Sequence, residues 1–292
     1  MLILGATSKS ISDAEAVIAV ADLAALPCHS FVRQTALATL ANALHQAGRY
    51  GDALESFKKA EAIQAGRQPE FQLLYSVSGF DCCDLILTSA ERGAWRETLA
   101  PTQVARAQQV GQDTATSLRE WTRYCELVRG RIDQTQKAWI GVFTNDATLL
   151  DHALEHLSLG RAGLCLAVLH HSSIDDCRLE LDLAVNKLRH AATQHHMPRG
   201  LLSRAWLRHV EGDTDGARAD LDEAWDIAER GPMRLHMADI HLYRARLFFR
   251  EKHYPWKSPH DDLAAAEKLI NDCGYHRRDE ELADAKRAIL GG

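Results

Sequence analysis

Three segments, ALESFKKA (residues 53–60), AVNKLRHA (residues 184–191) and ARADLDEA (residues 217–224), share one pattern of alanine, large apolar residue and alanine. Intervals of four and three residues place these side chains on one face of a helix. The second and third segments begin 33 residues apart, which is the length of one helix-turn-helix unit. We therefore predict that the chain is built from repeated helical hairpins.

A glycine-containing turn precedes two of these segments. The turns are GRYGD (residues 48–52) and GDTDG (residues 212–216), and a small residue, Ala41 or Ala205, stands seven residues before each. Small residues let two helix axes approach closely, and large apolar residues then fill the space between neighbouring pairs. Each turn is thus predicted to join two helices of one hairpin.

The rest of the chain of 292 residues is also expected to be helical. Apolar residues recur with a period near 3.6, and no alternating pattern typical of a strand appears. We predict an all-α fold in a single array over residues 1–292, with residues 1–130 and 148–292 as possible sub-arrays. The repeat register cannot be followed between residues 106 and 148.

Both ends of the chain carry helix-boundary signals. Ser12 and Glu15 fit a capping box for a first helix expected over residues 13–26. Near the other end, a helix that Ser258 caps is followed by a C-terminal capping helix over residues 279–290. That last helix has acidic residues in its first turn and basic residues near its end, which suits the helix dipole.

The first hairpin resembles the tetratricopeptide repeat (TPR), which places small, aromatic and alanine residues at fixed intervals. The resemblance rests on these residues: Leu37, Leu40, Ala41, Leu44, Gly48, Tyr50, Ala53, Phe57 and Ala60. This copy lacks the usual tryptophan and the closing proline, and a weaker copy surrounds Gly93 and Trp95. The resemblance implies a superhelical solenoid of antiparallel helix hairpins.

The C-terminal half is similar to the end of the TPR sensor region in bacterial STAND-type NTPases. The similar stretches are residues 197–205, 220–247, 254–263 and 273–282. In that family the repeats follow a nucleotide-binding switch and sense a ligand or partner. No phosphate-binding loop of the form G-x-x-x-x-G-K-[ST] is present here. The resemblance therefore implies a sensor piece or a stand-alone array, with an NTPase module as one expected partner.

Composition excludes several classes of partner. The formal net charge of −6 provides no basic field for nucleic acid. The 7 cysteines contain no C-x-x-C pair, which fits reduced thiols. No run approaches the ~18 apolar residues of a membrane span, and the first residues lack the basic region of a signal peptide. We expect a cytoplasmic protein that binds neither nucleic acid, membrane nor cofactor.

The concave face is the usual binding surface of such an array. The repeat register predicts these exposed inner-face positions: Asn42, His45, Arg199, Leu202, Trp206, His209, Leu242, Arg246 and Phe249. Arginine and tryptophan are favoured anchors because they combine large contact area with directed polar groups. Ordinary packing between hairpins is the alternative for Trp206 and Phe249. The function predicted is a non-catalytic protein- or peptide-binding scaffold or sensor.

A basic cluster suggests what this groove prefers. Four arginines could select an acidic partner segment through charge-assisted hydrogen bonds: Arg199, Arg204, Arg208 and Arg246. Alternatively, Arg204 and Arg208 form a solvated face. Some TPR proteins hold a terminal carboxylate with asparagine and lysine. Asn42 matches that pattern, but Ala38 stands at the lysine position, so such a clamp is not indicated.

The competing interpretation is a metal-dependent or thiol enzyme that uses the histidine-rich region from His152 to His196. His152 and His156 are four residues apart, but two ligands are fewer than zinc requires. Residues 212–223 lack the spacing of a calcium loop. Since no catalytic signature accompanies these residues, we predict no enzyme activity and no metal site.

The segment from Val17 to Leu26 is apolar and lacks a charged outer face. Such a surface can pair with a second copy of the chain or with upstream repeats, so a homodimer remains an open alternative.

Overall fold

The computed structural model describes residues 2–23, 29–100, 112–142 and 148–291. These ranges contain twelve α-helices, two short 3-10 helices and no strand, which confirms the all-α class for the described chain. The elements are η1 (Leu2–Leu4), α1 (Thr7–Leu23), α2 (His29–Gln46), α3 (Tyr50–Arg67), α4 (Ser76–Leu99), α6 (Gln112–Val142), α7 (Leu149–His170), α8 (Asp175–His190), α9 (Met197–Glu211), α10 (Thr214–Arg230), α11 (Arg234–Phe248), α12 (Pro259–Cys273), η2 (His276–Arg278) and α13 (Asp279–Leu290).

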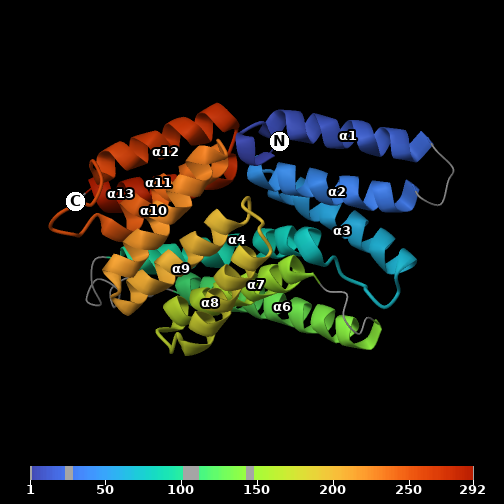
Figure 1. The fold of residues 1–292 in the computed structure, drawn as a ribbon, viewed down its shortest axis with the longest axis horizontal. Helices are drawn as coiled ribbons and strands as arrows, with labels where there is room; N and C mark the ends of the chain where they lie inside the picture. The colour runs from blue at the N-terminus through green and yellow to red at the C-terminus, as the bar shows by residue number, and fades with distance from the viewer. Residues whose placement is uncertain (1, 24–28, 101–111, 143–147, 292) are drawn as a thin grey trace.

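Consecutive helices pack as hairpins. The closest pairs are α2 with α3, α7 with α8, α9 with α10, and α11 with α12 (Figure 1). Two of these hairpins are the ones that the sequence predicts around its glycine turns. The structure is thus an array of helical hairpins.

The predicted turns end and start helices by local chemistry. Gly48 and Gly212 have φ of 76° and 85°, values that favour glycine because no Cβ opposes them. The side chain of Asp213 then accepts a hydrogen bond from the backbone N–H of Gly216 at 2.9 Å and caps α10. Ser258 caps α12 as predicted, by accepting from the N–H of Asp261 at 3.0 Å.

The repeated small residues lie in the core. The following alanines have no exposed surface: Ala41, Ala53, Ala60, Ala184, Ala205, Ala217 and Ala224. Phe57 and Leu221 are buried beside them and fill the space between helices, as expected. Ala191 differs, because α8 ends at His190 and Ala191 follows as its half-buried C-cap residue.

Two local expectations are wrong, and the structure explains why the repeat register could not be followed. Gly93 lies inside the continuous helix α4 and makes no turn; its missing side chain leaves room for Trp121, whose ring would stand 2.7 Å from a Cβ there. The register is lost from residue 112 onward because α6 is one helix of 31 residues that passes through Gly130. The first helix begins at Thr7, so Ser12 and Glu15 lie within it.

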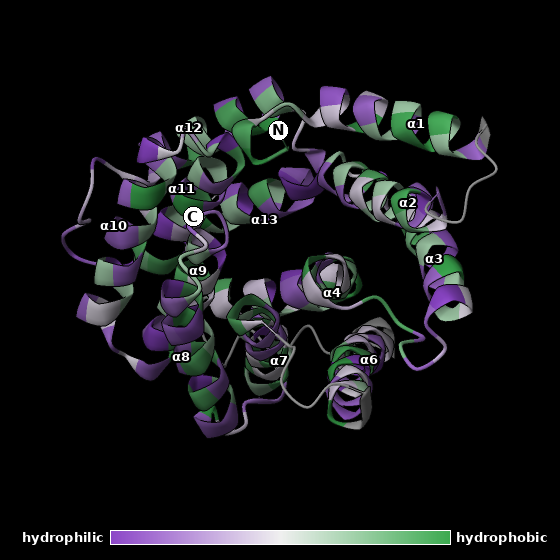
Figure 2. Cartoon of the chain, turned by 45° about the vertical axis from the view of Figure 1, so that its right-hand side comes forward, coloured by the Kyte–Doolittle hydropathy of each residue, from purple (hydrophilic) through white to green (hydrophobic). Residues whose placement is uncertain are grey.

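The two ends of the array meet. The hydroxyl of Tyr50 donates to the backbone carbonyl of Arg277 at 3.1 Å, and Gly48 packs against His276. Gly5 lies so close to Cys273 that a Cβ would be 2.5 Å from the cysteine Sγ. The two ends adjoin through η1 beside α11 and α2 beside η2, and α4 lies between α2, α6, α7 and α13 (Figure 2).

The described part of the chain also bears on two expectations from composition. Its six cysteines are free and buried, whereas Cys28 lies outside the described residues. None of its helices combines the length and the apolar character needed to cross a membrane.

We expect Ala217→Leu to lower the free energy of unfolding by about 1–3 kcal/mol, because the added methylenes have no space between α9 and α10. The matched control is Ala219→Leu, an exposed position on the same helix, which should change stability by less than about 0.5 kcal/mol. Urea denaturation of both variants measures the difference, and equal stabilities would contradict the packing described for this hairpin.

Candidate functional site

Several of the residues predicted to line a binding groove instead contact another helix of this chain, α4. Asn42 donates from Nδ2 to the carboxylate of Asp81 at 2.7 Å, and a ring nitrogen of His45 lies 2.9 Å from the hydroxyl of Thr88. Both partners belong to α4. The inner face of α2 is therefore turned towards α4.

The tryptophan and arginines predicted for the groove contact α4 as well. Trp206 stacks on Trp95 with ring centroids 4.0 Å apart, and its Nε1 donates to the hydroxyl of Thr98 at 3.1 Å. The guanidinium of Arg246 lies 4.7 Å from the centre of the Trp95 ring. Arg199 donates to Asp84 at 3.3 Å. These side chains therefore all pack against the same helix, α4.

The expectation that these positions face solvent is wrong for several of them. His45, Leu202, Trp206, Leu242 and Arg246 are each at most 3% exposed. The physical reason is that other helices cover these faces: α4 packs against His45, Trp206 and Arg246, and Leu242 lies in a core cluster with residues of α12 and α13. Whether any of them also binds a partner stays a prediction.

His209 and Phe249 lie apart from α4. The His209 ring packs near that of Phe248, with centroids 6.2 Å apart, and Phe249 lies beneath the guanidinium of Arg250. Both are partly exposed. The structure therefore does not bring these two residues together with the rest of the predicted groove.

The remaining arginines of the predicted basic cluster are paired within the chain. Arg204 donates to both oxygens of Asp220, at 2.9 and 2.6 Å, and Arg208 lies 3.0 Å from the same carboxylate. Arg246 donates to Glu281 at 2.9 Å. The arginines that were expected to select an acidic partner are therefore engaged in ion pairs within the chain.

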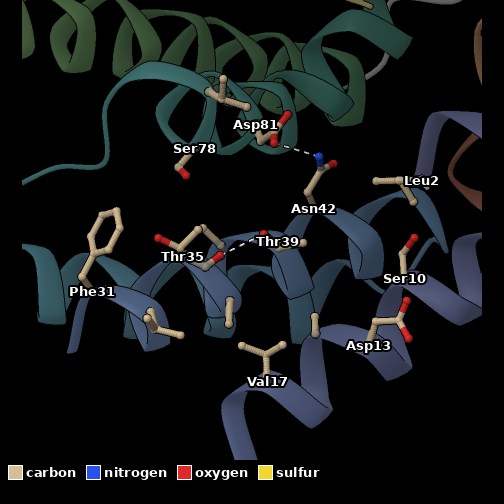
Figure 3. Close-up of a pocket in the computed structure, with 15 residues that line it drawn as sticks. Leu2, Ser10, Asp13, Val17, Phe31, Thr35, Thr39, Asn42, Ser78 and Asp81 are labelled. Atoms are coloured by element: carbon tan, nitrogen blue, oxygen red, sulfur yellow. Dashed lines mark hydrogen bonds between the residues drawn. The ribbon is translucent and has the colours of Figure 1, made fainter. Parts of the chain in front are cut away.

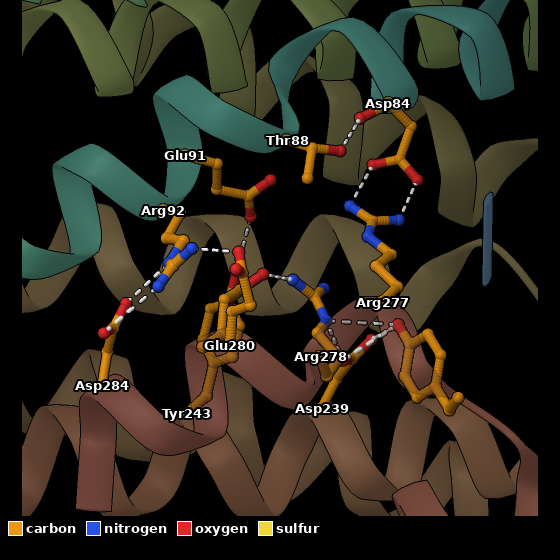
Figure 4. A network of polar contacts seen from close by, with 12 residues as sticks. Asp84, Thr88, Glu91, Arg92, Asp239, Tyr243, Arg277, Arg278, Glu280 and Asp284 are labelled. Carbon is orange, nitrogen blue, oxygen red and sulfur yellow. Dashed lines mark hydrogen bonds and ion pairs between the residues drawn. The ribbon is translucent and has the colours of Figure 1, made fainter. Parts of the chain in front are cut away.

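Asp84 is the centre of a buried ionic network (Figure 4). Its carboxylate accepts hydrogen bonds from Arg161 at 2.7 Å and from both terminal nitrogens of Arg277, and Arg199 approaches as described. Burial alone would raise the pKa of Asp84, but the charges of the three guanidiniums hold it well below its usual range. Asp84 is therefore ionised.

The network continues to α13. Arg278 donates to Asp239 at 2.8 Å and also binds Glu281, which in turn accepts from Arg246. The hydroxyl of Tyr275 donates to Asp239 at 3.1 Å (Figure 4). These buried charges are paired with one another, which offsets their desolvation.

A second set of ion pairs lies closer to the surface. Arg92 and Arg96 of α4 donate to Asp284 of α13 at 2.7 and 2.9 Å, and Arg92 also binds Glu280. Their charges hold the pKa of Asp284 at about 2, against the opposing effect of burial. This pair of helices forms one wall of an open groove.

We call that opening the cationic groove. It has a volume of about 810 Å³ and is bounded by α3, α4, α6 and the start of α13. Its apolar and aromatic residues include Tyr50, Leu54, Trp121, Tyr124 and Leu127. Leu54 and Leu127 are 43% and 48% exposed, so the groove presents apolar surface to solvent.

The groove concentrates positive charge in a chain that is negative as a whole. Six basic residues line it: Lys58, Arg92, Arg96, Arg123, Arg131 and Arg277. Three acidic residues accompany them: Glu61, Glu280 and Glu281. Arg131 is paired with Glu61, whereas Lys58 and Arg123 are exposed and make no ion pair within the described chain.

Sequence reasoning missed this groove because one of its walls comes from α6, where no repeat could be followed. A signal was present: Trp121, Tyr124 and Leu127 recur every three residues and form one stripe along that helix. The same spacing is also typical of residues that are buried in a core. That these residues line a groove is visible only from the position of α6 beside α3.

The histidines of the central region form no ligand set. His156 pairs with Glu180 at 2.7 Å, and His152 lies 3.7 Å from Glu155. No group of three or more potential metal-ligating side chains occurs in the described residues. Burial raises the pKa of the Cys82 and Cys83 thiols, which keeps them in the unreactive protonated form.

The pKa of Asp81 is shifted in the opposite direction from that of Asp84. Burial raises the pKa of Asp81 to about 7, and the charge of Asp84 adds to that rise. Arg199, Arg277 and the amide of Asn42 oppose it. The carboxyl therefore changes charge near neutral pH.

No protein-family model matches the chain, and no curated protein is similar to it.

We expect Asp84→Asn to lower the free energy of unfolding by about 3–5 kcal/mol, because it leaves three buried guanidiniums around an uncharged amide. Since the folded-state pKa of Asp84 is depressed, this contribution is present above the unfolded-state pKa and is lost as the pH falls. Asp133→Asn, which removes an exposed ion pair with Lys137, is the control and should cost less than about 1 kcal/mol. Denaturant unfolding that finds equal losses would contradict the network.

Asp81→Asn should stabilise the chain in a pH-dependent way. The wild-type chain loses stability as the pH rises from about 4 towards about 7, because the carboxyl ionises more readily in the unfolded state. The variant lacks this loss and should be more stable than wild type by about 2–4 kcal/mol above neutral pH. Unfolding measured across this range tests the sign. A difference that does not vary with pH would show that Asp81 has an ordinary pKa.

Proposed function

We propose that this chain is a non-catalytic recognition module that binds an acidic, apolar-containing segment of a partner protein in the cationic groove. The observation that carries the proposal is the coincidence, in one open groove, of exposed apolar side chains, aromatic rings and unpaired cations. Such a combination suits a peptide that contributes both apolar and acidic side chains.

The charges of the groove argue for acidic side chains. Lys58 on α3 and Arg123 on α6 line the groove without an ion-pair partner in the described chain. A carboxylate beside either side chain would gain a charge-assisted contact without breaking an existing ion pair. The chain as a whole carries a charge of −6, so this attraction is confined to the groove and does not favour long polyanions.

The aromatic residues argue for an apolar component in the same ligand. Tyr50, Trp121 and Tyr124 reach the groove from two helices, with Leu54 and Leu127 beside them. Rings of this kind supply large contact area at low conformational cost and are enriched among binding anchors. A purely ionic ligand would leave this surface exposed to water.

The TPR resemblance belongs to this proposal. It is supported by the glycine turns, the buried alanines and the hairpin packing of α2 with α3 and of α9 with α10. The resemblance to the sensor region of STAND-type NTPases extends the proposal to a particular partner, an NTPase encoded on the same or a neighbouring reading frame. Inspection of the flanking reading frames tests that extension.

A random peptide library displayed on phage, panned on the purified chain, tests the proposed function. We expect enriched peptides to combine aspartate or glutamate with leucine or an aromatic residue. A labelled peptide from that set should bind the double variant Lys58→Glu, Arg123→Glu at least about 10-fold more weakly than wild type, a loss of about 1.4 kcal/mol.

The matched control is Lys252→Glu, Arg230→Glu, which makes the same change in net charge at exposed positions outside the groove. This variant should bind the peptide as wild type does. Enrichment of peptides without acidic residues, or equal losses in the two double variants, would contradict the proposed site.

A further inference from the structure

A second cavity shares no lining residue with the cationic groove. It occupies the space between α1, α2 and the first turns of α4 and has a volume of about 730 Å³ (Figure 3). We call it the N-terminal pocket. Its size falls within the range of small-molecule sites.

The walls of the N-terminal pocket are mostly apolar. Val17 projects from α1, Phe31 and Val32 from α2, and Val77 from the first turn of α4. All four side chains are more than one third exposed, although they lie around one cavity. An apolar body that entered the pocket would cover them and remove this surface from water.

The charged groups of the pocket are of one sign. Asp13 and Asp81 line it, and no lysine, arginine or histidine does. Asp81 is only 9% exposed, and its Oδ2 accepts a hydrogen bond from Asn42. The second oxygen, Oδ1, has no hydrogen-bond partner in the described chain. Because Oδ1 is not among the polar atoms that are buried without a partner, it is open to the cavity, where the donor group of a ligand can reach it.

We propose that the N-terminal pocket binds a small aliphatic amine, with its ammonium group at Asp81 and its apolar chain against Val17, Val32 and Val77. The ammonium donates to the free Oδ1, and Asp13 at the edge of the pocket adds attraction. An anionic ligand is repelled by both carboxylates, whereas an uncharged alcohol donates a hydrogen bond to Asp81 without the attraction of a positive charge. The proposal is independent of the cationic groove, which shares no lining residue with this pocket.

The surroundings of Asp81 make the binding depend on pH. The groups that act on its carboxyl are Asp84 on the same helix, Asn42 on α2, Arg199 on α9 and Arg277 on η2. The net result is a carboxyl with a pKa of about 7. Because the ammonium prefers the ionised form, its affinity should fall by about 10-fold when the pH is lowered one unit below that value.

Titration calorimetry on the full chain tests the proposal, with n-octylamine as the probe and 1-octanol and octanoate as matched ligands. At about pH 8 we expect octylamine to bind at least about 10-fold more tightly than octanol, and octanoate to bind more weakly than either. Asp81→Asn should remove the preference for octylamine over octanol. Val77→Trp, which places an indole at the pocket from a partly exposed position, should weaken both ligands.

Asp226→Asn, an exposed position on α10, is the control and should leave every affinity unchanged. Asp81→Asn removes the charge of the pocket, whereas Val77→Trp fills its volume. If one of the two variants fails to fold, the other still tests the proposal. The proposal is overturned if octylamine binds no better than octanol, or if both pocket variants bind octylamine like wild type. It is also overturned if a short apolar peptide with a free amino terminus binds while octylamine does not, since the pocket would then recognise a protein segment.

Discussion

The arrangement of this chain depends on one buried carboxylate. Asp84 accepts hydrogen bonds from guanidiniums that stand 77, 115 and 193 residues away in the sequence. A buried charge is costly unless its partners are in place, and here each partner comes from a different element, α7, α9 or η2. The same carboxylate therefore requires the middle and the end of the array to pack around α4 at once.

Because the helices pack around α4, the inner faces of several hairpins are not free to bind a ligand. In an open solenoid the inner helix of each hairpin is available to a ligand. Here the inner residues bind α4, as the stacking of Trp206 on Trp95 and the contact of Asn42 with Asp81 illustrate. The recognition that we propose uses two other openings, the cationic groove and the N-terminal pocket, which differ in the sign of their charge.

Local features of the fold could be predicted from sequence, and distant ones could not. The turns at Gly48 and Gly212 follow from glycine beside helical periodicity, which is local information. Gly93 misled the same reasoning, because a glycine that admits a tryptophan looks like a turn glycine until its neighbour is known. Several of the predicted groove residues are buried against other helices of the chain, and no sequence spacing reveals that Asp84 and Arg277 meet. The acidic side chains of α4 were the available signal: Asp81, Asp84 and Glu91 lie among largely apolar neighbours in residues 79–91, and buried carboxylates require cationic partners.

Backbone hydrogen exchange along α4, followed by mass spectrometry on the intact chain, tests most directly whether this helix is the permanent occupant of the concave face. The account predicts that the amides from Asp84 to Trp95 exchange only through global unfolding, as slowly as the slowest amides of α9. Rapid exchange of that stretch, with α9 and α10 still protected, would contradict it and would mean that α4 leaves the concave face in the native state.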